Sequence, residues 1–154
     1  HLSSLRDRLT VTHQTGEVDF EKVSEAYRAA GWQNVEVKRY ISEIVTEFAK
    51  SDLIICRAGA TTCAELAAAG KAALMVPLPT AADDHQRKNA EAMVNAGAAK
   101  MILQMNLSGE TLAAEIAEMA ANPEKLSEME VAARGMARRD AAEVTCDIIE
   151  SLRH

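Results

Sequence analysis

The sequence of 154 residues has few aromatic side chains: one Trp, two Tyr and two Phe. Proteins that bind single-stranded nucleic acid stack the bases on aromatic rings, and so few rings offer little surface of that kind. The net charge of −6 also leaves no basic stripe that would neutralise the phosphates of a nucleic-acid backbone. We therefore expect no nucleic-acid partner.

Cysteines are few, and none belongs to a CxxC pair. Cys56, Cys63 and Cys146 are odd in number, which favours buried, reduced thiols in a cytoplasmic protein over a disulfide framework or a metal site. Long apolar runs are missing too, so the sequence predicts no membrane-spanning helix and no signal peptide. The first residue is His1 rather than Met, which suggests a fragment or a processed piece of a longer protein.

Short apolar runs alternate with longer segments of helical periodicity along the whole chain. The pattern predicts strands at 9–14, 35–40, 53–56, 73–77 and 99–103, helices at 19–30, 42–50, 60–69, 83–95, 108–121 and 140–152, and a further helix opened by Pro123. Strands that alternate with helices of about ten residues indicate βαβ units. We therefore predict the α/β class, with a doubly wound parallel sheet in one Rossmann-like domain over residues 1–154.

Several predicted elements carry signals of their ends or of their burial. Ser42 and Ser108 are suitable N-caps, and Gly70 is a suitable C-cap for the Ala-rich helix before it. The apolar run 53–56 is typical of a strand that is covered on both faces.

In a doubly wound sheet, ligands bind at the carboxyl ends of the strands, beside the N-termini of the helices. Here the strand ending at Cys56 is followed by Arg57, by Gly59, which would permit a tight turn, and by the start of a helix. The free N–H groups and the positive dipole end of that helix suit a diphosphate. Thr61, Thr62 and, one turn later, Glu65 lie on one side of it, and the Glu65 carboxylate could accept hydrogen bonds from ribose hydroxyls. On spacing alone, a capped helix with a solvated Glu65 is the alternative.

Two further junctions carry polar or apolar groups that suit a sugar nucleotide. After the stiff loop at Pro77, the segment 83–90 offers Asp84, His85, Gln86 and Asn89 as side chains that could read sugar hydroxyls; a surface role is the alternative for His85. At 39–44, the backbone of Ile41 could pair with the edge of a flat ring, and packing of Ile41 and Ile44 into the core is the alternative.

Five segments in a fixed order carry a family resemblance. They are HQTG (13–16), RYI (39–41), DLIICRAGATTCAELAAAGKAALMVPLP (52–79), DDHQRKNA (83–90) and AGAAKMI (96–102). In this order the chain, from about Leu9 to its last helix, resembles the C-terminal, donor-binding domain of the MurG family of two-domain GT-B glycosyltransferases. Members of that family transfer N-acetylglucosamine from UDP-N-acetylglucosamine (UDP-GlcNAc) to lipid I, giving lipid II in peptidoglycan synthesis.

The resemblance implies a role for each member of a set of substrate-binding residues. Ile41 would contact uracil through its backbone, Glu65 would hold the ribose hydroxyls, and Gln86 would bind hydroxyls of the sugar. The helix start would meet the phosphates and the sugar, and Arg57 would support the loop. Family members often carry a second Gln where this chain has His85. The implied set is Ile41, Arg57, Ala60, Thr61, Thr62, Glu65, His85 and Gln86.

The departures from the family pattern are also informative. A first strand with a Gly-rich loop, expected one helix before Leu9, is absent, as is the N-terminal acceptor domain. We find no catalytic base, and we expect no metal or other cofactor because Asp83 and Asp84 are adjacent rather than a DxD pair. The missing domain would reach lipid I and the inner face of the cytoplasmic membrane, and an open sheet edge would invite self-association.

Three hypotheses follow from the resemblance and these departures. The chain is the inactive donor-binding part of such an enzyme, the soluble donor-binding subunit of a split UDP-sugar glycosyltransferase, or part of a related glycolipid glycosyltransferase.

Overall fold

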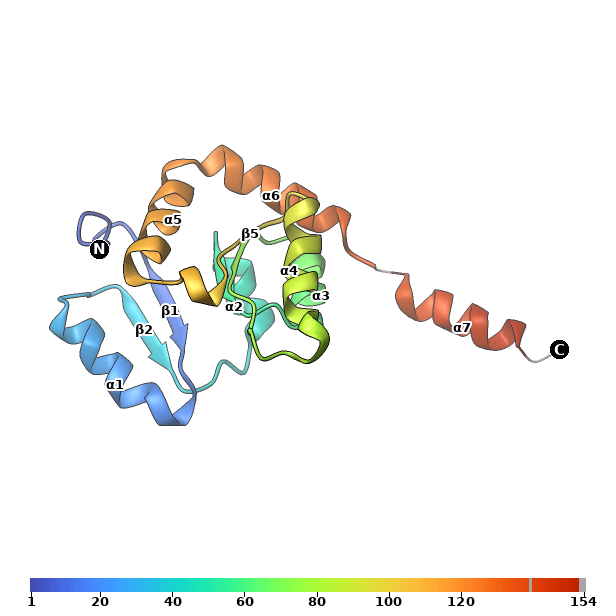
Figure 1. Cartoon of the computed structure of the whole chain (residues 1–154), viewed down its shortest axis with the longest axis horizontal. Helices are drawn as coiled ribbons and strands as arrows, with labels where there is room; N and C mark the ends of the chain where they lie inside the picture. The colour runs from blue at the N-terminus through green and yellow to red at the C-terminus, as the bar shows by residue number, and fades with distance from the viewer. Residues whose placement is uncertain (139, 153–154) are drawn as a thin grey trace.

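A computed structural model describes residues 1–138 and 140–152 (Figure 1). Strands and helices alternate over most of this length, as the sequence pattern predicts. The strands are β1 (Val11–Gln14), β2 (Val35–Lys38), β3 (Ile54–Cys56), β4 (Ala73–Met75) and β5 (Ala99–Met101). The helices are α1 (Gly16–Ala29), α2 (Ile44–Lys50), α3 (Ala60–Ala69), α4 (His85–Asn95), α5 (Gly109–Ala121), α6 (Pro123–Gly135) and α7 (Ala141–Ser151), with short 3-10 turns at Ala82–Asp84 and Gln104–Asn106.

The strands are parallel, which confirms the predicted α/β class, but they form two sheets rather than one. β1 pairs with β2, with Val11 opposite Val35. β3, β4 and β5 form the second sheet, with β4 in the middle. Within the described residues, no strand pairing joins the two sheets. In this part of the chain that the structure describes, β1, β2, β3 and β5 are therefore edge strands, each with one open edge.

The core lies around the second sheet, and β4 is buried along its whole length. Met75 points to the side covered by α3 and α4, where it packs with Leu66 and Met93. Leu74 points to the opposite side and packs with Met119 of α5 and Met129 of α6. Helices on both faces explain why β4 reads as an unbroken apolar run.

β3 differs from the sequence prediction on one face. Ile54 is buried, but Ile55 is 45% exposed. Ile55 lies opposite Leu74 in the strand register, on the side covered by α5 and α6, yet at the open edge of the sheet. The prediction that this strand is covered on both faces is therefore wrong for Ile55, because the covering helices do not extend over the free edge.

Two of the predicted helix ends agree with the structure, and two differ from it. Gly70 ends α3 in the left-handed conformation with φ of 63°, and Ser108 caps α5 in a reciprocal hydrogen-bond pair with Thr111. By contrast, Ser42 is not an N-cap, because α2 begins one residue later than that role requires, after Glu43. Asp83 and Asp84 do not belong to α4, because their φ values of 51° and 55° place both in the left-handed region, and α4 begins only at His85.

α7 extends away from the rest of the molecule in Figure 1. All of its residues are exposed, and its apolar side chains include Val144, Ile148 and Ile149, each more than 40% exposed. No helix among the described residues is long and apolar enough to cross a membrane.

Candidate functional site

The first turn of α3 follows directly from the carboxyl end of β3. Gly59 is the N-cap residue, and no side chain caps this end of the helix. The N–H groups of the first turn, from Ala60 to Thr62, are therefore the uncapped donors of an α-helix, and they share its positive dipole end. Such an end suits an anion such as a diphosphate.

Gly59 itself does not need the conformational freedom of glycine. Its φ of −64° and ψ of 151° are open to any residue, and an added Cβ would lie 3.7 Å from Thr62 Oγ1, an ordinary contact. The backbone turn at this position therefore does not depend on glycine. Without a side chain at Gly59, a ligand can approach the backbone closely at the helix start.

Arg57 lies in the loop after β3 and donates hydrogen bonds to the loops after the neighbouring strands β4 and β5. Its Nη1 atom donates to the carbonyl oxygens of Val76 at 3.0 Å and Pro77 at 3.3 Å, after β4. The same atom donates to Gln104 Oε1 at 2.8 Å, after β5. Arg57 thus connects the loops after β3, β4 and β5 at the carboxyl edge of the second sheet.

Gln86 and Asn89 lie on α4, one turn apart, and both reach the peptide groups of Ala58. Gln86 Oε1 accepts hydrogen bonds from the backbone N–H groups of Ala58 at 3.3 Å and Leu78 at 3.0 Å. Asn89 Nδ2 donates to the Ala58 carbonyl oxygen at 3.0 Å. Because the Gln86 oxygen is used within the protein, its amide NH₂ is the group left to donate to a ligand oxygen.

His85 is turned toward its own 3-10 turn. Its Nδ1 atom lies 2.7 Å from the carbonyl oxygen of Ala82, so Nδ1 carries the proton and donates. Only Nε2, then an acceptor, is left for a contact with a ligand. In the neutral ring, Nε2 could therefore accept a hydrogen bond from a sugar hydroxyl but could not donate one.

Glu65 and Ile41 complete the set of residues expected from the sequence. Glu65 is half-buried on α3, one turn after Thr61 and Thr62, and within the described chain its carboxylate has no hydrogen bond or ion pair. The backbone N–H of Ile41 donates to Gln14 Oε1 at 2.8 Å. Ile44 packs against the core beside Phe48, as its alternative role predicts.

The structure thus brings Arg57, Gln86 and the start of α3 together, and it adds residues that the sequence did not single out as site residues. These residues are Gln104, which accepts a hydrogen bond from Arg57, and Gln14, which accepts one from the backbone N–H of Ile41. Gln14 belongs to the HQTG segment, which is part of the family resemblance, so that segment was the available signal. Nothing in the sequence distinguishes Gln104 from other surface glutamines.

The cysteines near the site are protonated thiols. Burial, followed by the nearby Cys63, raises the pKa of the Cys56 thiol to about 12, and burial raises the pKa of Cys63 as well. All three cysteines are free, as predicted, but Cys146 is exposed and not buried. Thiols with raised pKa values are poor nucleophiles, so these two residues serve packing.

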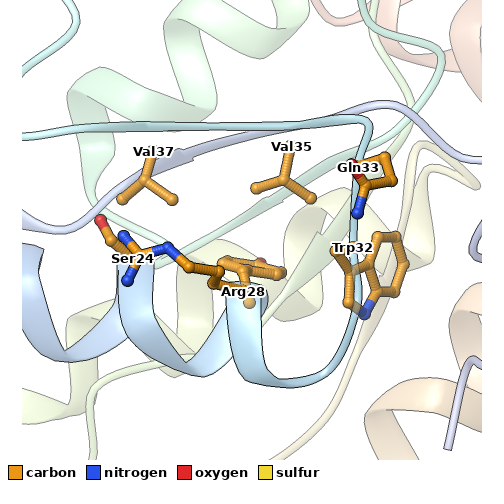
Figure 2. Close-up of a pocket in the computed structure, with 7 residues that line it drawn as sticks. Ser24, Arg28, Trp32, Gln33, Val35 and Val37 are labelled. Carbon is orange, nitrogen blue, oxygen red and sulfur yellow. The ribbon is translucent and has the colours of Figure 1, made fainter.

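A shallow pocket elsewhere contains none of the expected site residues. It lies between α1 and the β2 strand, where Val35 and Val37 face the helix (Figure 2). Trp32 closes one end, near the start of β2. The pocket thus lies along the face of β2 that α1 covers, whereas ligands of doubly wound sheets bind at the carboxyl ends of the strands. We therefore place the candidate site at α3 and not here.

The chain is similar in sequence to known proteins along most of its length. Residues 1–145 match the family model described as glycosyltransferase family 28 C-terminal domain. A protein of Citrifermentans bemidjiense is 48% identical over 143 residues, which are 93% of this chain and 40% of the relative. It is named UDP-N-acetylglucosamine–N-acetylmuramyl-(pentapeptide) pyrophosphoryl-undecaprenol N-acetylglucosamine transferase. A protein of an Anaeromyxobacter species with the same name is 45% identical over 152 residues, 99% of this chain and 40% of the relative.

The chain is also similar to solved structures of glycosyltransferases. The crystal structure of Acinetobacter baumannii MurG matches with a TM-score of 0.84 and 34% identity over 96% of this chain and 46% of that one. A glycosyltransferase of kitacinnamycin, 23% identical with a TM-score of 0.57, shares the fold. The chain spans about two fifths of the length of the curated relatives it matches. By the family model and by these relatives, the chain belongs to the glycosyltransferase family 28 C-terminal domain family.

Proposed function

We propose that this chain is the part of a glycosyltransferase that binds UDP-GlcNAc, the donor for transfer of N-acetylglucosamine to lipid I in peptidoglycan synthesis. The observation that carries the proposal is the uncapped start of α3 at the carboxyl end of β3. Gln86 and Arg57 hold the loops around it, and Glu65 lies half-buried one turn further along the helix.

The proposed roles follow from the chemistry of each group. The N–H groups at Ala60, Thr61 and Thr62 face the diphosphate, and Glu65 accepts hydrogen bonds from the ribose hydroxyls. Gln86 donates its free NH₂ to a sugar oxygen, and His85 Nε2 accepts from a sugar hydroxyl. The backbone of Ile41 pairs with uracil, which requires the Gln14 side chain to leave the Ile41 N–H.

In the proposed reaction this chain stabilises the leaving group. When the bond between the sugar and the diphosphate breaks, negative charge grows on the UDP oxygens, and donors fixed at a helix start stabilise that charge. Attack by an acceptor hydroxyl also needs a base. We propose that the base, the contacts with lipid I and the association with the inner face of the membrane belong to the part of the enzyme that this chain does not include.

We further propose that residues 1–154 form one donor-binding domain that is completed by another strand. A doubly wound domain has one continuous sheet, whereas here β1 and β3 each have an open edge. β1, rather than β2, lies nearer the rest of the molecule in Figure 1. A strand paired with both edges would join the two sheets and cover Ile55. Without it, we expect the edges to promote self-association, and a stable monomer in size-exclusion chromatography would contradict this.

Isothermal titration calorimetry tests the donor assignment. We expect saturable binding of UDP-GlcNAc, weaker binding of UDP-glucose and no binding of ADP-glucose. Glu65→Ala should lower the affinity for UDP-GlcNAc by about tenfold or more, because the ribose hydroxyls lose a charged acceptor. Glu124→Ala, an exposed glutamate in the first turn of α6, is the matched control and should bind as the unchanged chain does.

The other two hypotheses make different predictions in the same experiment. A glycolipid glycosyltransferase of different sugar preference would bind UDP-glucose at least as tightly as UDP-GlcNAc. A donor-binding subunit of a split enzyme would bind UDP-GlcNAc in the same way, and co-purification with a separate membrane-bound subunit would identify it. A folded chain that binds no UDP-sugar would contradict all three assignments.

A further inference from the structure

The peptide groups on either side of Ala58 are held by two side chains of α4. Gln86 Oε1 accepts from the Ala58 N–H, and Asn89 Nδ2 donates to the Ala58 carbonyl oxygen at 3.0 Å. Ala58 itself is fully buried. A buried backbone N–H or carbonyl that lacks a partner costs free energy, so both side chains are required where no strand or helix ladder pairs these groups.

The position of Ala58 matters because it lies directly before Gly59, the N-cap of α3. The direction of the N–H groups at the start of α3 depends on where this short connection is held. Gln86 is placed to contact the ligand itself. Asn89 is half-buried, and its NH₂ group donates to the Ala58 carbonyl oxygen. An effect of Asn89 on the ligand would therefore pass through the segment 57–59 between β3 and α3.

We propose that Asn89 is a positioning residue for the phosphate-binding end of the site: it anchors the Ala58 carbonyl and thereby aims the first N–H groups of α3 at the diphosphate. This inference rests on the proposed function. It assigns to Asn89 an effect on the phosphates and none on the nucleoside, because the uracil contact at Ile41 lies on a different loop, after β2. The ribose contact at Glu65 lies one turn beyond the first N–H groups of α3.

The variant Asn89→Leu tests the inference without adding charge. It keeps a side chain of similar size and good helix propensity but removes the donor to Ala58. Asn95→Leu, at the exposed last residue of the same helix, is the matched control. Circular dichroism and urea unfolding establish that each variant folds, and Asn89→Ala replaces Asn89→Leu if the larger side chain prevents folding.

The readout is the ratio of two dissociation constants, for uridine and for UDP, each measured by NMR titration of the full chain. The phosphates make this ratio large in the unchanged chain. We expect Asn89→Leu to lower the ratio by about tenfold, because a helix start that is no longer held in place binds the diphosphate less well. We expect Asn95→Leu to leave it unchanged.

The outcomes separate this inference from the proposed function. A variant that merely destabilises the protein weakens uridine and UDP binding by the same factor, so an unchanged ratio in Asn89→Leu overturns the positioning role while UDP binding by the parent chain stands. If the folded parent chain binds neither UDP nor UDP-GlcNAc, the proposed function fails first, and the positioning role fails with it.

Discussion

Arg57 Nη1 donates a hydrogen bond of 2.8 Å to Gln104 Oε1, although 47 residues separate the two along the chain. The same Arg57 atom reaches the carbonyl oxygens of Val76 and Pro77. One guanidinium group thus connects the loops after β3, β4 and β5. It is a fork of fixed shape, which a lysine ammonium does not reproduce.

Arg57→Lys should therefore weaken donor binding more than it weakens the fold. We expect the affinity for UDP-GlcNAc to fall by about tenfold, because Lys keeps the charge but loses the geometry that reaches several acceptors. Calorimetry measures the affinity and urea unfolding the stability. Arg87→Lys is the control, since Arg87 is exposed and pairs with Glu91 one turn further along α4. An equal loss of affinity in both variants would argue against a role for the Arg57 connections.

Gln86→Glu should separate recognition of the sugar from recognition of the nucleotide. One carboxylate oxygen can still accept from the N–H groups of Ala58 and Leu78, but the other replaces the donor NH₂ group. Binding of UDP-GlcNAc should weaken by about tenfold or more, and binding of UDP should change much less. Isothermal titration with both ligands checks this, and an equal loss for both would place Gln86 away from the sugar.

Leu74→Ala should strongly destabilise the domain. Leu74 is fully buried in the central strand β4, among Ile102, Met119 and Met129, and removing such a side chain costs about 2–5 kcal/mol in free energy of unfolding. Val18→Ala, at a site that is 94% exposed, should change it by less than about 0.5 kcal/mol. Urea unfolding of both variants gives the comparison, and similar midpoints would contradict the assignment of the core.

Glu118 should contribute to the loss of stability in acid. Its carboxylate accepts from Lys100 Nζ at 2.6 Å and Lys125 Nζ at 2.8 Å. These hydrogen bonds, that of Lys100 first, lower its pKa from 4.5 to about 2. The stabilisation is present above pH 4.5 and is lost as the pH falls toward 2.

Urea unfolding between pH 6 and about pH 3 should therefore show a steeper loss of stability in the unchanged chain than in Glu118→Gln. Glu124→Gln tests whether the loss of any surface carboxylate has the same effect. Parallel pH profiles for the unchanged chain and Glu118→Gln would show that these ion pairs do not operate in solution.

The cysteines should differ in reactivity toward alkylation. Cys146 is exposed on α7, whereas burial raises the pKa of Cys56 to about 12 and also raises that of Cys63. Because the thiolate is the reactive form, iodoacetamide at pH 8 should modify Cys146 first, and the other two only after unfolding. Mass spectrometry of the alkylated chain, with Cys146→Ser as the control, measures the order. Early modification of Cys56 would contradict its burial.

The sequence predicted those features that depend on local pattern. The apolar run at β4, the left-handed Gly70 and the Ser108 cap each follow from a few neighbouring residues, and the structure confirms them. The positions of Arg57 and the α3 start at a strand end followed in the same way from the α/β pattern and the family resemblance.

Features that depend on contacts between distant segments were not predictable. The exposure of Ile55 depends on which edge of β3 has a neighbour, and the left-handed conformations of Asp83 and Asp84 depend on how the loop meets α4. The hydrogen bond from the Ala58 N–H to Gln86 Oε1 was not predictable either, because nothing in the segment 83–90 indicates that Ala58 lies near it in the fold.

The most direct test of the central claim is a two-dimensional ¹⁵N NMR titration of the chain with UDP-GlcNAc. The account predicts that the largest shift changes occur at the backbone amides of Ala60, Thr61 and Thr62, with further changes at Ile41, and that Trp32 in the pocket of Figure 2 is unaffected. Changes centred on Trp32, with the start of α3 unaffected, would contradict it.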